Sequence, residues 1–144
     1  MPTLAPHIVV RDLVRAVQWY ADVLGAREVS RVPLPGDKVL TVELAFGDTS
    51  VHLSDEFPDM GIVSPLTLGG TYGALQLTTD DVDTLFERAV DAGAEVFHPV
   101  ADMFWGDRQG QVVDPFGHRW NLSQHLRDVP SEEIAAEAAK VFGA

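Results

Sequence analysis

Apolar residues recur at helical spacing in two stretches of the chain, with charged residues between them. Each stretch follows an acidic residue that can cap a helix, Asp12 in the first and Asp80 or Asp81 in the second, and each ends near a glycine, Gly25 or Gly93. The aspartate and a Gly-Ala pair recur at an offset of 68 residues, which indicates an internal repeat. The apolar stripes are Val14, Val17, Ala21 and Leu24 in the first helix, and Val82, Leu85, Phe86, Ala89 and Val90 in the second.

Shorter apolar runs around these helices predict strands, separated by turn sequences such as the one at residues 34–37. The predicted fold class is α+β, with two tandem βαβββ modules that form curved mixed sheets around a cavity, plus a C-terminal helix. We predict a single domain, in which module 1 covers about 5–57, a linker 58–70, module 2 about 71–125 and the last helix 131–143. The predicted strands are 7–10, 27–32, 38–46 and 50–54, followed by 73–78, 95–99, 110–114 and 119–124.

The strand at 38–46 alternates between an apolar side, with Val42 and Leu44, and a mixed polar side that carries Glu43. We expect the apolar side to cover a helix and the opposite face to line a pocket. A lone carboxylate that faces a cavity costs free energy unless it is paired, so Glu43 indicates either a ligand or an ion pair with an arginine. The same pocket face is expected to display His7, His52, Gln76 and Asn121, and the two histidines have the alternative of a purely structural role.

Composition limits the kinds of molecule that the protein can bind and the kinds of site that it can contain. Ten Lys and Arg against 22 Asp and Glu give a formal charge of −12, which repels nucleic acid and anionic membranes. The absence of cysteine excludes disulfides, thiolate metal sites and a cysteine nucleophile. The sequence also lacks a Gly-x-Ser-x-Gly elbow and a P-loop. We therefore expect a neutral or cationic small molecule as the partner and, because no basic leader or long apolar segment is present, a cytoplasmic location.

Several features together resemble the vicinal oxygen chelate superfamily, which contains glyoxalases, bleomycin-resistance proteins and extradiol dioxygenases. They are the tandem modules, Val-Arg-Asp-Leu at 10–13, and above all Asp-Pro-Phe-Gly-His-Arg-Trp at 114–120. The resemblance covers residues 5–125. The loop at 103–108, the strand around Asn121 and the tail after it look more narrowly like the PhnB-like branch.

The resemblance implies four positions, one on each of four inner strands, where the superfamily's enzymes carry His or Glu ligands to a divalent cation. In module 1 these positions fall beside His7 and on His52, and in module 2 they fall beside Gln76 and on Asn121. Borderline metals are held by imidazole together with carboxylate or thiolate, so this set lacks an anionic ligand unless Glu43 joins it. We therefore expect no cofactor, with a divalent metal such as Zn, Ni, Mn or Fe as the alternative.

These arguments predict a small-molecule-binding protein that works without a metal and binds or sequesters an aromatic or cationic compound such as an antibiotic. Trp105, in the loop at 103–108, is suited to stacking on a planar ligand or to a dimer contact, with core packing as the alternative. Whether the chain is an enzyme stays open: the alternative is a metal-dependent lyase, isomerase or dioxygenase, and a weaker third possibility is a structural dimer. The resemblance also implies a homodimer. The predicted ligand-binding residues are His7, Glu43, His52, Gln76, Trp105 and Asn121, and no catalytic or metal residue is assigned.

Overall fold

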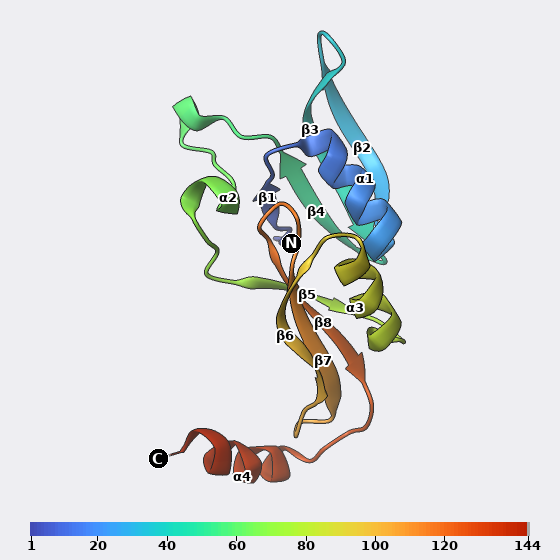
Figure 1. Ribbon diagram of the computed structural model, residues 1–144, viewed down its shortest axis with the longest axis vertical. Helices are drawn as coiled ribbons and strands as arrows, with labels where there is room; N and C mark the ends of the chain where they lie inside the picture. Colours follow the sequence, from blue (N-terminus) through green and yellow to red (C-terminus); the bar gives the residue numbers. More distant parts are fainter. Residues whose placement is uncertain (144) are drawn as a thin grey trace. The chain divides into compact units, whose positions relative to one another are not determined.

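A computed structural model describes residues 1–143 of the chain. It contains two compact units (Figure 1). The first unit comprises Met1–Gly73 together with Asp114–His118, and the second comprises Ala74–Val113 together with residues 119–143. Each unit contains a βαβββ module, in which one helix packs on a four-stranded mixed sheet, and further helical structure. The α+β class and the two tandem modules predicted from the sequence are confirmed.

The first unit begins with strand β1 (His7–Val9), which leads into helix α1 (Leu13–Leu24). Strands β2 (Arg27–Leu34), β3 (Lys38–Phe46) and β4 (Thr49–Ser54) complete a sheet of order β1-β4-β3-β2, in which only β1 and β4 run parallel. The segment that follows contains a 3-10 turn, η1 (Pro58–Met60), and a single helical turn, α2 (Pro65–Leu68).

Helix α1 has the ends that the sequence predicts. The Asp12 side chain accepts a hydrogen bond from the backbone N–H of Arg15, and Gly25 ends the helix at φ 76°, a left-handed conformation that glycine adopts without strain. The helix packs on β3 and β2, where Val42 and Leu44 are almost fully buried. This packing confirms that the apolar side of β3 covers a helix and turns the side of Glu43 away from it.

The second unit repeats this arrangement. In the chain, strand β5 (Ala74–Thr78) precedes helix α3 (Val82–Asp91) and strand β6 (Glu95–Asp102) follows it. Strands β7 (Asp107–Val113) and β8 (Arg119–His125) complete a sheet of order β5-β8-β7-β6. Helix α3 packs on β7, β6 and β8.

Gly110 marks the close approach of α3 to the sheet. A Cβ atom at this position would lie 2.8 Å from a ring carbon of Phe86, so only glycine fits there. It follows that Gly110 faces α3 and that its neighbours along β7, Gln109 and Gln111, face the other side of the sheet.

Strands β6 and β7 are both longer than predicted, and they form a continuous hairpin over residues 95–113. The sequence indicated a strand end at Pro99, because proline cannot donate a ladder hydrogen bond. Since β6 is an edge strand and its pairing shifts between His98 and Ala101, the proline is accommodated without breaking a central ladder.

The turn at Asp114–His118 joins β7 to β8 and packs into the first unit. The Tyr20 hydroxyl donates to Asp114 Oδ2 at 2.5 Å, and Asp114 Oδ1 accepts from the backbone N–H groups of Phe116 and His118 at 2.8 and 3.0 Å. The Phe116 ring lies edge-on to Trp19, with 6.4 Å between ring centroids. The signature segment therefore serves as part of a buried core as well as a turn.

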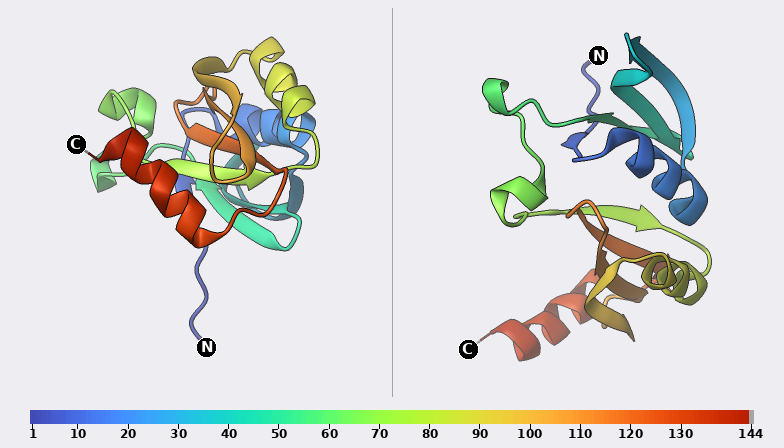
Figure 2. Two further views of the ribbon diagram at one scale, coloured as in Figure 1. Left: turned by 90° about the horizontal axis from the view of Figure 1, so that it is seen from below. Right: turned by 45° about the horizontal axis from the view of Figure 1, so that its top comes forward.

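The last element is helix α4 (Ser131–Phe142), which confirms the C-terminal helix expected from the sequence. It extends beyond the end of β8 and away from the sheet of its unit (Figure 2). None of its residues is buried, and Val141 and Phe142 are 60% and 77% exposed. The apolar side chains at the end of this helix are therefore exposed in the single chain.

Candidate functional site

In the first unit, three predicted site residues lie in one row across neighbouring strands. His7 on β1 is the register partner of His52 on β4, and His52 is in turn the partner of Glu43 on β3. All three lie on the sheet face turned away from α1. The Ser50 hydroxyl donates a hydrogen bond of 2.9 Å to Glu43 Oε2, so the carboxylate is held by a serine and not by the arginine that the sequence left as an alternative.

The second unit has a corresponding row made of amides. Gln76 on β5 pairs with Asn121 on β8, and Asn121 pairs with Gln111 on β7, again on the face away from the helix. Asn121 Nδ2 donates to Gln76 Oε1 at 3.3 Å. The structure thus brings the predicted pair Gln76 and Asn121 together. Because the first-unit trio belongs to the other unit, a pocket shared by all five residues stays a prediction.

Three side chains on the polar face of β7 and β8 have buried polar atoms that lack a hydrogen-bond partner among residues 1–143. They are the acceptor oxygens Gln111 Oε1 and Asn121 Oδ1 and the donor Arg119 Nε. The Arg119 guanidinium lies over the Phe97 ring, 4.6 Å from its centroid. Buried polar groups are almost always paired, so a group of unpaired ones on one face requires an explanation.

Sequence reasoning missed Gln111 and Arg119. Each stands two residues from a polar residue on the same face, Gln109 on β7 and Asn121 on β8, so strand alternation places them correctly. What alternation does not reveal is whether each polar atom finds a partner, because that depends on contacts across the sheet.

Trp105 lies in the tight turn between β6 and β7, where its ring meets the Phe104 ring edge-on at 4.9 Å between centroids. The turn is held by a hydrogen bond from the backbone N–H of Gly106 to the carbonyl of Met103. Strand β7 begins at Asp107, four residues before Gln111, so the tryptophan stands about 13 Å along the strand from the amide row, at ~3.3 Å per residue. The second unit therefore does not bring Trp105 next to Asn121.

The sequence resemblance suggests a divalent metal ion, so we ask whether the residues on these faces could hold one. In the part of the chain that the structure describes, no three His, Asp or Glu side chains are grouped so that they could hold a metal ion. In the second unit one ligand position carries Asn121 and the other lies beside Gln76, and these two amides bond to each other. Neither an imidazole nor a carboxylate stands at these positions. Amide oxygens suit hard cations that take many oxygen ligands, and they suit a borderline metal poorly. The second-unit residues therefore do not fit such a metal.

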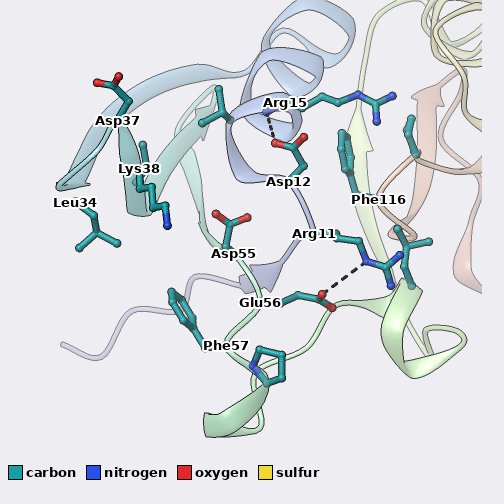
Figure 3. A pocket seen from close by; sticks show the side chains of 15 residues that line it. Arg11, Asp12, Arg15, Leu34, Asp37, Lys38, Asp55, Glu56, Phe57 and Phe116 are labelled. Carbon is teal, nitrogen blue, oxygen red and sulfur yellow. Dashed lines mark hydrogen bonds and ion pairs between the residues drawn. The ribbon is translucent and has the colours of Figure 1, made fainter.

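A separate hollow of about 860 Å³ opens in the first unit at the start of α1 (Figure 3). None of the six predicted site residues lines it. Its walls come from the beginning of α1, the β2–β3 hairpin, the chain after β4 and the buried turn around Phe116, and its acids were not expected from the sequence to form a site.

The acids of this hollow are bonded within the protein. Asp55 Oδ1 accepts from the backbone N–H of Leu13 at 2.8 Å, and burial, the largest cause, raises the pKa of Asp55. The Thr67 hydroxyl and the Ser64 backbone N–H donate to Glu56, and these hydrogen bonds, more than the nearby Arg11, lower the pKa of Glu56 to about 2. Asp55 and Glu56 therefore cap the start of α1 and fix the loop after β4.

The chain is similar in sequence to a known family and to individual proteins. Residues 3–122 match the family model of the Glyoxalase/Bleomycin resistance protein/Dioxygenase superfamily. An uncharacterized protein of Mycobacterium bovis is 43% identical over 138 residues, which cover 94% of this chain and 91% of that protein. A lactoylglutathione lyase of Arabidopsis thaliana is 27% identical over 82% of this chain and 43% of the lyase.

The fold of this chain is also similar to the folds of solved protein structures. TioX from Micromonospora sp. ML1 superposes with a TM-score of 0.64 at 27% identity, covering 90% of this chain and 100% of that one. A PhnB protein from Bacillus cereus superposes with a TM-score of 0.67 over 85% of this chain and 99% of that one, and at 13% identity this likeness concerns the fold alone.

Proposed function

Because the chain belongs to the Glyoxalase/Bleomycin resistance protein/Dioxygenase superfamily, we propose that it uses this fold to bind, and so sequester, a small organic compound without a metal. The observation that carries the proposal is the amide pair of Gln76 and Asn121. By the sequence resemblance, Asn121 occupies one of the positions that carry metal ligands in the superfamily's enzymes, and Gln76 stands beside the other. Neutral amides bind organic N–H and C=O groups by hydrogen bonding, which is the task of a binding site.

The chemistry of the polar faces favours a compound with N–H donors. Glu43 on the first unit and the unpaired oxygens of Asn121 and Gln111 on the second are all acceptors. The formal charge of −12 attracts such a compound when it is cationic. An aromatic body is favoured by the exposed ring of Phe97 and by Trp105. An antibiotic sequestered in this way would confer resistance.

A second candidate function is a metal-dependent lyase, isomerase or dioxygenase. The residue types of His7, His52 and Glu43 favour it, since these two imidazoles and a carboxylate stand on neighbouring strands, although in the described chain their side chains are not grouped around one point. The lactoylglutathione lyase among the relatives points the same way.

Titration of divalent metals into metal-stripped protein separates the two functions. We expect weak binding of Ni, Zn, Mn and Fe(II), unchanged by His52→Ala, and small-molecule binding that does not depend on added metal. A stoichiometric metal that disappears in His52→Ala, together with small-molecule binding, would instead establish the metal-dependent enzyme.

A further inference from the structure

We propose that the second unit recognises an organic acid that also carries an N–H donor, with Arg119 binding its carboxylate and the oxygens of Asn121 and Gln111 accepting from its N–H. This inference rests on the proposed small-molecule-binding function and adds the chemical class of the ligand. It uses residues of the second unit only.

The first step of the argument is the state of Arg119. Its Nε–H is buried and has no hydrogen-bond acceptor within the described chain, and the residue takes part in no ion pair there. Arg108 of the same unit, by contrast, is paired with Asp83 and Asp102. A permanent cation without a counter-ion attracts an oxyanion, and hydrogen bonds between such charged groups are strong.

The second step is the position of the guanidinium. Its carbon lies over the Phe97 ring, 4.6 Å from the ring centroid. Because Nε is buried, the terminal nitrogens, which are not among the buried unpaired atoms, are the donors that a carboxylate meets. Contact with Phe97 restrains the side chain in advance of binding, which reduces the entropy lost when a ligand binds.

The third step is the position of the unpaired acceptors. Asn121 lies two residues from Arg119 on β8, about 6.6 Å along the strand at ~3.3 Å per residue, and Gln111 is the direct cross-strand partner of Asn121. One molecule can therefore span the donor and both acceptors. The oxygens of Asn121 and Gln111 accept no hydrogen bond from Arg119 although it stands on the same face. The protein leaves complementary groups unsatisfied side by side, as expected for a site that a ligand completes.

The probes for the test are N-benzoylglycine and N-benzoyl-β-alanine, which carry an aromatic ring, an amide N–H and a carboxylate at two spacings. N-Benzoylglycine amide removes the charge, and benzoyloxyacetate replaces the N–H by an ester oxygen. Benzamide and benzamidine supply neutral and cationic N–H donors without an acid. Binding is measured by calorimetry and by ligand-observed NMR at millimolar concentration on the full chain.

We expect at least one N-benzoyl acid to bind about 10- to 100-fold more tightly than its amide, as a hydrogen-bonded charge contact implies. Arg119→Met should abolish this preference, whereas Arg127→Met, a matched change at an exposed arginine of the same unit, should not. Arg119→Lys keeps the charge without the planar fork and should retain only part of the preference. Gln111→Met should weaken the N-benzoyl acids and leave benzoyloxyacetate unaffected.

The outcomes separate this inference from the proposed function. If benzamide or benzamidine binds and the acids gain nothing over them, the inference is wrong and the binding function stands. A preference for acids that survives in Arg119→Met also overturns the inference. If no member of the series binds at millimolar concentration, the inference is rejected, whereas the proposed function still depends on the metal titration. Melting curves of each variant confirm that the fold is retained.

Discussion

Replacing Gln111 by methionine should stabilise the protein, although the same change usually weakens a buried polar position. Gln111 Oε1 is buried without a partner in the described chain, so in the unliganded protein this oxygen has lost water and gained nothing. An unsatisfied buried acceptor costs about 1–3 kcal/mol. Methionine has a similar length and no such acceptor, and its flexible stem adapts to the space.

Gln109 provides the matched control, since it stands two residues earlier on the same face of β7. Its Nε2 donates to Ser123 Oγ at 3.1 Å, and the two residues are 8% and 3% exposed. Gln109→Met removes this hydrogen bond and leaves the Ser123 hydroxyl buried and unpaired, at a cost of about 1–2 kcal/mol. Two chemically identical substitutions are therefore expected to have opposite signs.

The magnitudes can be measured by thermal unfolding followed by circular dichroism. Allowing for the part of the Gln111 amide that reaches water, we expect a net gain of about 1 kcal/mol, which raises the Tm by about 3 °C in a chain of this size. Gln109→Met should lower the Tm by about 3–6 °C. A fall in Tm for Gln111→Met as large as that for Gln109→Met would mean that the Gln111 oxygen has a partner in solution, and the argument for an incomplete site would fail.

Further predictions concern the anchors of the fold. Tyr20→Phe removes the hydroxyl that donates to buried Asp114 and should lower the free energy of unfolding by about 1.5–3 kcal/mol, measured by urea denaturation; an unchanged midpoint would show that the turn is held without it. Hydrogen bonds that the His125 ring donates to Asp107 and, second, to Asp128 raise the pKa of His125 above 6.5. The stability that His125 contributes is therefore complete below pH 6.5 and lost as the pH rises through the raised value. Melting curves should therefore show wild type losing its advantage over His125→Gln at alkaline pH, and a constant difference from pH 5 to 9 would contradict this. Deleting residues 131–144 should leave the Tm of dilute protein nearly unchanged, because α4 buries no residue; a large drop in that Tm would mean that α4 packs on its own chain. We also expect a homodimer, and light scattering that gives 15.7 kDa at all micromolar concentrations would refute it.

Local chemistry in the sequence was sufficient to predict the elements of the fold. Asp12 and Gly25 bound α1 as their capping preferences require, and the alternation around Glu43 placed the correct side of β3 against the helix. The predictions failed where distant packing decides. Pro99 argued for a strand end, and only its place on an edge strand explains why β6 continues. The amphipathic pattern of α4 predicts a helix with an apolar side, and the pattern does not say which surface covers that side.

The candidate site shows the same difference between what local periodicity predicts and what distant packing decides. Strand periodicity placed His7, His52 and Glu43 in one row and Gln76 beside Asn121, because residues two apart share a face. It did not find Arg119, whose significance lies in a missing partner and in a ring that comes from another strand. The packing of the turn at residues 114–118 likewise depends on Tyr20, 94 residues away from Asp114. The turn sequence by itself does not predict this contact.

The central claim is that this chain binds a small organic compound without a metal. The most direct test uses wild-type protein purified without tag or chelator and measures its affinity for each benzoyl or benzamide compound that binds, before and after dialysis against EDTA. Metal content is determined on the same samples. We predict substoichiometric metal and the same Kd in both samples. Stoichiometric metal, whose removal abolishes binding and whose return restores it, would contradict the claim.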